Sequence, residues 1–149
     1  MPDPATKRSP EHWFVLACAL AAPLGLAALA LVLRPDARGF GTHEQLGFQP
    51  CLPIRLWNLP CPGCGVTTAV TLALQGHPLR SLATQPFGLV TIAVVAAFAL
   101  FAVRAHRRGC DLFQELSHLP WLRCGVPLAV LLVLCWIYKT LLVRGVIGL

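Results

Sequence analysis

The stretch WFVLACALAAPLGLAALALVL, from Trp13 to Leu33, contains 21 consecutive residues without a charged side chain. An α-helix rises about 1.5 Å per residue, so a helix of this length matches the ~30 Å hydrocarbon core of a bilayer. A secretory signal peptide has a shorter apolar segment, of about 7–15 residues. We therefore interpret Trp13–Leu33 as a retained transmembrane helix, with a cleaved signal peptide as the alternative.

Two further stretches have the same property. Pro86–Val103 contains 18 uncharged residues, and Gly125–Val143 contains 19 residues interrupted only by Lys139. Hydrophobic residues make up 56% of the chain and charged residues 12%, whereas soluble domains contain about 25% charged residues. The sequence therefore predicts an all-α polytopic membrane protein with about three transmembrane helices. We expect the Lys139 ammonium to reach the membrane interface, because long basic side chains near helix ends do so.

The formal net charge of +6 does not indicate nucleic-acid binding, because the basic residues stand in short clusters beside the apolar stretches. That placement is a topology signal. It favours an N-terminus on the cytoplasmic side of the membrane and a first loop, residues 34–85, on the outer side. We divide the chain into a polar N-terminal tail, residues 1–12, and a single membrane domain, residues 13–149.

The first loop contains the sequence NLPCPGCGVTTAV, Asn58–Val70. Apolar residues then recur at helical spacing, and Gly76 and Pro78 provide stop signals. This pattern predicts a helix over about residues 65–75, which would be only ~16 Å long. Such a helix cannot cross a bilayer, so we expect it to be interfacial or re-entrant.

Pro62, Gly63 and Gly65 are interpreted as a structural turn that places this short helix. Proline and glycine favour a tight reversal, and glycine also permits close helix packing. In an oxidising compartment, a disulfide between two thiols of the loop would serve the same structural purpose.

Cys51, Cys61 and Cys64 form a candidate thiol site, with two chemical alternatives to the structural interpretation. In a redox pair, the start of the following helix would lower the pKa of Cys64, although no βαβ pattern surrounds the CxxC. In a zinc site, Cys51 would be the third ligand, and His43 or water a candidate for the fourth. His77 is excluded as a ligand because the short helix would separate it from Cys64 by ~16 Å.

The remaining cysteines and carboxylates suggest no chemistry. Cys18 and Cys135 lie within predicted spans and are interpreted as packing residues, while Cys110 and Cys124 are expected to be free thiols in the second loop. That loop also contains a possible amphipathic helix, Asp111–Leu119. No predicted span contains a carboxylate, and no common enzyme motif is present, so we do not expect an enzyme, nor any cofactor other than a possible zinc ion.

The segment from Pro50 to Phe87 resembles the small bacterial membrane protein family catalogued as domain of unknown function 2752. The residues that match its pattern are Cys51, Cys61, Pro62, Gly63, Cys64, Gly65, Thr67, Ala69, Leu72, Gly76 and Pro86. The resemblance implies a membrane location and several helices, and it implies no reaction. Thr68 stands where the family has arginine and Gln85 where it has asparagine. If the family's arginine contacts an anion or a lipid headgroup, this chain lacks that contact.

Taken together, these features predict a scaffold or accessory subunit embedded in the lipid bilayer, with a thiol-based site as the alternative function. The small face formed by Gly65, Thr68, Ala69 and Ala73 could receive another helix. A membrane protein partner or a homo-oligomer is therefore the expected type of association.

Overall fold

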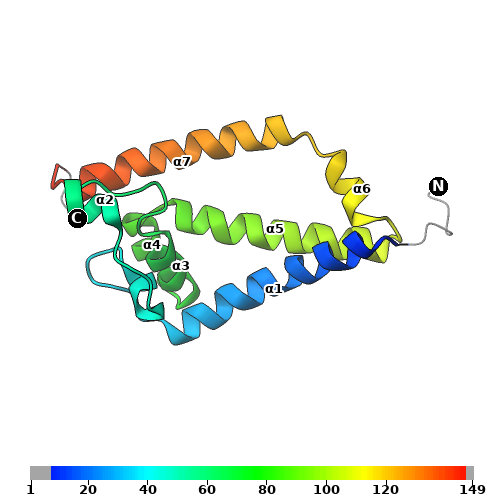
Figure 1. Ribbon diagram of the computed structural model, residues 1–149, viewed down its shortest axis with the longest axis horizontal. Helices are drawn as coiled ribbons and strands as arrows, with labels where there is room; N and C mark the ends of the chain where they lie inside the picture. Colours follow the sequence, from blue (N-terminus) through cyan, green and yellow to red (C-terminus); the bar gives the residue numbers. More distant parts are fainter. Residues whose placement is uncertain (1–7, 147–149) are drawn as a thin grey trace.

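Three long helices lie lengthwise along the molecule in the computed structural model, which describes residues 8–146 (Figure 1). They are α1 (Pro10–Val32), α5 (Phe87–Arg107) and α7 (Trp121–Val143). Their most apolar segments have mean hydropathies of 2.5, 2.3 and 2.2, so each helix is long and apolar enough to cross a membrane. The prediction of an all-α protein with three such helices is confirmed. Of the predicted polar tail, residues 1–7 lie outside the described part of the chain.

The two loops contain five short helices. They are η1 (Thr42–Leu46, a 3₁₀ helix), α2 (Leu52–Trp57), α3 (Val66–Leu74), α4 (Pro78–Thr84) and α6 (Leu112–Ser117). The sequence pattern indicates α3 and α6, but η1, α2 and α4 have too few residues to show a helical period. For α4, Pro78 is a first-turn residue rather than only a stop signal, because proline at that position sacrifices no helical hydrogen bond.

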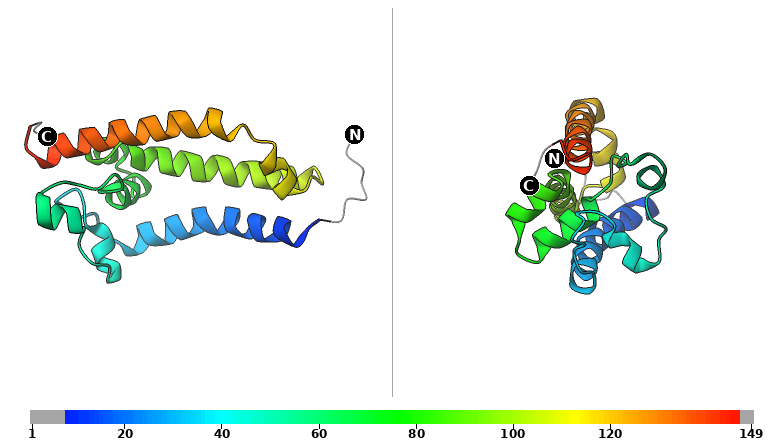
Figure 2. Two further views of the ribbon diagram at one scale, coloured as in Figure 1. Left: turned by 45° about the horizontal axis from the view of Figure 1, so that its top comes forward. Right: turned by 90° about the vertical axis from the view of Figure 1, so that its left-hand side faces the viewer.

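Helix α3 packs among α1, α4 and α5 at one end of the molecule (Figure 2). Five consecutive residues, Thr68–Leu72, are buried, so the short helix is covered by protein. It approaches α5 closely, because a Cβ atom added to Gly88 of α5 would lie only 2.5 Å from the Cβ atom of Ala69. Glycine at position 88 therefore allows the backbones of α3 and α5 to come into close contact.

Gln75 follows the last turn of α3 and joins it to the end of α1. Its side-chain amide nitrogen donates to the carbonyl oxygens of Ala30, at 2.7 Å, and Leu33, at 3.0 Å. The last carbonyls of a helix have no partner within the helix. The Gln75 side chain thus satisfies two carbonyls at the end of α1.

At the opposite end, polar contacts join the start of α1 to α5 and α6. The Asp111 carboxylate caps α6 and also accepts a hydrogen bond from the backbone N–H of Ser9, at 2.9 Å. The Ser9 hydrogen bond is the main reason that the pKa of Asp111 lies below its usual value. His12 is fully buried, with Nε2 3.0 Å from Nδ1 of His106 and Nδ1 accepting from the backbone N–H of Leu112.

Helix α7 is anchored through its C-terminal half. Trp136 donates from Nε1 to the carbonyl oxygen of Pro60, and the Tyr138 hydroxyl donates to the carbonyl oxygen of Ala83, both at 2.7 Å. Toward its N-terminus, α7 diverges from α5 (Figure 1). Apolar side chains in this half are exposed: Leu122, Val126 and Val130. An exposed apolar face of this kind suits contact with lipid or with another transmembrane helix.

Candidate functional site

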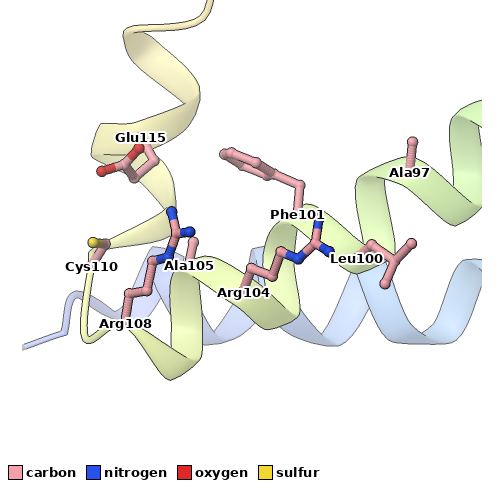
Figure 3. A pocket seen from close by; sticks show the side chains of 8 residues that line it. All are labelled: Ala97, Leu100, Phe101, Arg104, Ala105, Arg108, Cys110 and Glu115. Atoms are coloured by element: carbon pink, nitrogen blue, oxygen red, sulfur yellow. The ribbon is translucent and has the colours of Figure 1, made fainter.

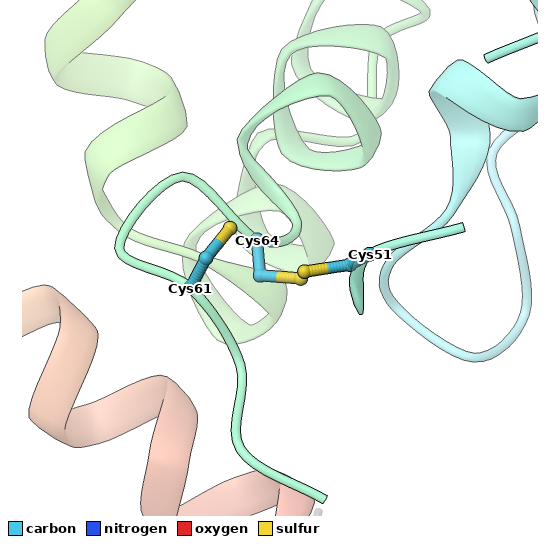
Figure 4. Close-up of side chains that lie close together, drawn as sticks. All are labelled: Cys51, Cys61 and Cys64. Carbon is cyan, nitrogen blue, oxygen red and sulfur yellow. The ribbon is translucent and has the colours of Figure 1, made fainter. Parts of the chain in front are cut away.

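Cys51, Cys61 and Cys64 come together at the end of the molecule that holds α2, α3 and α4. Their three sulfur atoms all lie within 4.8 Å of one another (Figure 4). Cys64 is buried, and the other two are partly buried. We call these three residues the cysteine cluster.

The local sequence explains how Cys51 comes to lie beside Cys61 and Cys64, which follow it by 10 and 13 residues. Cys51 is the N-cap of α2, a helix of six residues that ends at Asn58 in the left-handed conformation, with φ of 50°. The chain then turns back, and the CPGCG segment closes two successive turns. In these turns the Cys64 N–H donates to the Cys61 carbonyl, at 2.9 Å, and the Val66 N–H donates to the Gly63 carbonyl, at 3.1 Å.

Gly65 ends this double turn at the N-cap of α3, with φ of 87°. Side chains other than glycine rarely adopt that conformation. A Cβ atom at Gly65 would also lie 2.7 Å from the carbonyl oxygen of Gly39 and 3.2 Å from Nζ of Lys139. Two independent constraints therefore require glycine at the last position of the motif.

Lys139 of α7 is the residue that the sequence pattern placed wrongly. Its side chain is 3% exposed and points into the protein instead of reaching the membrane interface. Nζ donates to the carbonyl oxygens of Gly39, at 2.9 Å, and Thr84, at 3.0 Å. Nζ also lies 6.0 Å from the centre of the Phe40 ring, so the protein itself surrounds the ammonium group with two carbonyl oxygens and an aromatic face. Among residues 8–146, no carboxylate forms a salt bridge with Lys139.

The ammonium group of Lys139 is consequently a buried positive charge beside the cysteine cluster. It lies against Gly65, which follows Cys64 directly. A buried charge is unfavourable unless it is paired and hydrogen-bonded. Two carbonyl acceptors satisfy two of its three N–H donors, and a negative charge on the cysteine cluster would supply the missing counter-charge.

The three thiols differ in acidity. Burial alone would raise the pKa of Cys51, but hydrogen bonds from the backbone N–H groups of Cys61 and Ile54 and from the other two thiols outweigh it, so this pKa falls below its ordinary value. Burial and the contact with Cys51 raise the pKa of Cys61. Burial, followed by the charges of Cys61 and Cys51, raises the pKa of Cys64 to about 12.

These values correct the expectation that the helix start would activate Cys64. Helix N-termini do favour thiolates. Cys64, however, precedes the first residue of α3 by two positions, is buried, and has two neighbouring thiols that compete for the negative charge. In the metal-free cluster, the first negative charge therefore belongs to Cys51.

Alkylation of metal-free protein is expected to follow the same order. At pH 7, N-ethylmaleimide should modify Cys51 first, because its lowered pKa leaves more thiolate, which is the reactive form. Burial and the neighbouring thiols raise the pKa of Cys64, so little of this thiol is ionised at pH 7, and Cys64 should react last and gain reactivity as the pH rises. Peptide mapping by mass spectrometry after timed labelling measures the order. Equal rates at Cys51 and Cys64 would contradict this assignment of charge.

The other predicted candidates lie outside the cysteine cluster. The group of converging sulfur atoms includes neither His43 nor His77. His43 lies in η1 and His77 is the exposed residue before α4. Among the remaining cysteines, Cys18 and Cys124 are exposed, and only Cys135 of the two span cysteines is buried in the protein. The exposure of Cys18 means that it faces the surroundings of α1 rather than packing against another helix.

Three apolar helices of spanning length, with a protein-covered short helix between the first two, define a multi-pass α-helical membrane protein. Residues 51–99 match the family model described as a protein of unknown function (DUF2752). The match confirms the resemblance read from the sequence and covers the whole cysteine cluster. A search of curated proteins finds no match, and neither does a search of solved structures.

The two departures from the family pattern are both buried. Thr68 is 1% exposed, and its hydroxyl lies 2.8 Å from that of Thr42, which joins α3 to η1. A threonine pair therefore occupies the position where the resemblance implies arginine. Gln85, where the resemblance implies asparagine, is fully buried, and nothing in the structure explains that difference.

Proposed function

We propose that this protein is a scaffold or accessory subunit of a bacterial cytoplasmic membrane, and that a zinc ion bound by Cys51, Cys61 and Cys64 fixes its first loop. The observation that carries the proposal is the convergence of the three sulfur atoms within 4.8 Å. In tetrahedral zinc–thiolate sites the Zn–S bond of about 2.3 Å places sulfur atoms ~3.8 Å apart. The sulfur separations in the cysteine cluster, at most 4.8 Å, exceed that spacing by about 1 Å or less.

Charge favours a divalent ion in this position. Zinc with three thiolates carries a net charge of −1, and the buried Lys139 ammonium beside Gly65 neutralises it. A Cu(I) ion with the same three ligands would carry −2 and leave one negative charge without a partner. Thiolates are soft ligands that suit both metals, so charge is the feature that separates them.

The metal would join the start of α2 to the turn before α3, two parts of the first loop that the short helix α2 otherwise connects. One thiolate comes from the start of α2 and two come from the turn before α3. Because α3 packs against α1, α4 and α5, fixing this turn also fixes how the first two spans are arranged. The fourth zinc position, which no residue of the cysteine cluster fills, is available to water or to a group from a partner protein.

The remaining parts of the proposal are the orientation of the protein in the membrane and its partner. An N-terminus inside the cell would place the cysteine cluster at the outer side of the membrane, together with the end of α7 that holds Lys139. The exposed apolar side chains in the N-terminal half of α7 would receive a membrane protein partner or a second copy of the chain.

Metal analysis of purified protein tests the proposed zinc site. Protein purified in detergent under reducing conditions without chelator is expected to contain about one zinc per chain by inductively coupled plasma mass spectrometry. Replacement of zinc by Co(II) should produce the sulfur-to-cobalt charge-transfer absorption of a thiolate site. A second preparation, alkylated in the membrane before any reductant is added, checks the thiols: no metal together with a disulfide between two of the three cysteines would overturn the zinc site.

A further inference from the structure

A cavity of about 420 Å³ opens at the corner between α5 and α6, near the end of the molecule opposite the cysteine cluster (Figure 3). Its polar side is formed by Arg104 and Arg108, which lie one helical turn apart on one face of α5. Glu115 of α6 lies across from them. Two guanidinium groups against one carboxylate leave the cavity with a net positive charge.

Neither arginine has its charge neutralised within the described part of the chain. In residues 8–146, neither Arg104 nor Arg108 forms a salt bridge, and Glu115 forms none either. Both arginine side chains are exposed at the end of a membrane-spanning helix. The guanidinium groups are therefore free to donate paired hydrogen bonds to a phosphate group.

The part of the cavity that lies further along α5, toward the middle of the span, is apolar. Ala97, Leu100 and Phe101 line it and share the face of α5 that carries Arg104. They precede Arg104 by three to seven residues, which places them up to ~10 Å closer to the middle of the span. Leu100 is 56% exposed, so this apolar surface is open to the surroundings of the helix. The cavity thus changes from basic at the membrane surface to apolar toward the bilayer centre.

We propose that this cavity binds one anionic phospholipid, with its phosphate held by Arg104 and Arg108 and an acyl chain lying along Leu100 and Ala97. The order of the groups along α5 matches the order of phosphate, glycerol and acyl chain in a lipid whose headgroup lies at the membrane surface. A free phosphate ion would use only the basic side of the cavity. The site is independent of the proposed zinc site, because the two lie near opposite ends of the molecule.

Titration of detergent-solubilised protein with lipids, followed by native mass spectrometry, tests the site. We expect wild-type protein to bind phosphatidylglycerol more tightly than phosphatidylcholine or glycerol 3-phosphate. The double variant Arg104→Gln/Arg108→Gln should bind phosphatidylglycerol roughly 30-fold more weakly, and each single variant roughly 5-fold more weakly, because each substitution removes a charge-assisted hydrogen bond to the phosphate.

Arg107→Gln is the matched control, because Arg107 is an exposed arginine of the same helix end that does not line the cavity. Its effect should stay below about 3-fold, because an exposed charge that makes no direct contact with the lipid contributes little. An effect of Arg107→Gln equal to that of Arg104→Gln would overturn the site in favour of a diffuse basic surface. Glycerol 3-phosphate binding as tight as that of phosphatidylglycerol would overturn the lipid assignment. Far-UV circular dichroism confirms that each variant is folded, and the single variants carry the test if the double variant is not.

Discussion

Replacing Cys64 with serine is expected to abolish stoichiometric zinc binding. The serine hydroxyl has nearly the shape of the thiol but does not ionise at neutral pH, so the site loses one of its three anionic ligands. Loss of an outer-shell partner of a metal typically weakens binding 10- to 100-fold, so loss of a direct ligand should weaken it by more than ~100-fold. Competition with a chromophoric zinc chelator measures the change.

Thermal stability provides a second readout of the same substitution. Zinc that binds only the folded protein stabilises it by about 4 kcal/mol when its free concentration is a thousandfold above the dissociation constant. Added zinc should therefore raise the unfolding midpoint of wild-type protein and leave that of Cys64→Ser unchanged. Cys51→Ser should behave in the same way, because Cys51 supplies the only ligand from the start of α2.

Cys124→Ser is the control for a general effect of removing a thiol, because Cys124 is exposed and lies outside the cysteine cluster. It should keep one zinc per chain and the zinc-dependent rise in the unfolding midpoint. Full zinc occupancy in Cys64→Ser would show that the metal binds elsewhere.

Lower pH should weaken zinc binding by wild-type protein, because the thiols release protons when the metal binds, and the raised pKa values of Cys61 and Cys64 strengthen this dependence.

The spans could be predicted from the sequence, whereas the surroundings of the cysteine cluster could not. The run Trp13–Leu33 indicates a transmembrane helix by itself, because its uncharged length matches the ~30 Å hydrocarbon core of a bilayer. The short helix after CPGCG is likewise a local feature, marked by its periodicity and by Gly76. These features depend on neighbouring residues, so the sequence alone contains the information.

The buried position of Lys139 could not be predicted from its neighbours in the sequence. Its contacts are with Gly39 and Thr84, which precede it by 100 and 55 residues. A lysine four residues from the end of an apolar run is compatible with an interfacial position, and only the path of the first loop makes the buried position more favourable. The approach of Cys51 to Cys61 and Cys64 depends in the same way on α2, whose six residues show no helical period.

Gly65→Ala is expected to lower the free energy of unfolding by about 2–5 kcal/mol. Holding alanine in a left-handed conformation costs about 1–2 kcal/mol, and crowding in a packed region typically costs about 1–3 kcal/mol. Both terms apply, because φ is 87° and the new Cβ atom would lie 2.7 Å from the Gly39 carbonyl oxygen. Backbone atoms on one side and the buried Lys139 side chain on the other leave little room for relaxation.

Gly63→Ala is the matched control for Gly65→Ala, because it adds the same methyl group to the other glycine of the same motif. Gly63 is absent from the residues with positive φ, and a Cβ atom there would have no neighbour within 4 Å. Its unfolding free energy should therefore change by less than about 0.5 kcal/mol. Denaturant-induced unfolding of the two variants in detergent measures the difference.

Because Gly65 separates the cysteine cluster from α3, Gly65→Ala should also weaken zinc binding, whereas Gly63→Ala should not. Equal stability of the two variants would mean that the CPGCG turn does not depend on the contact of Gly65 with Gly39 and Lys139.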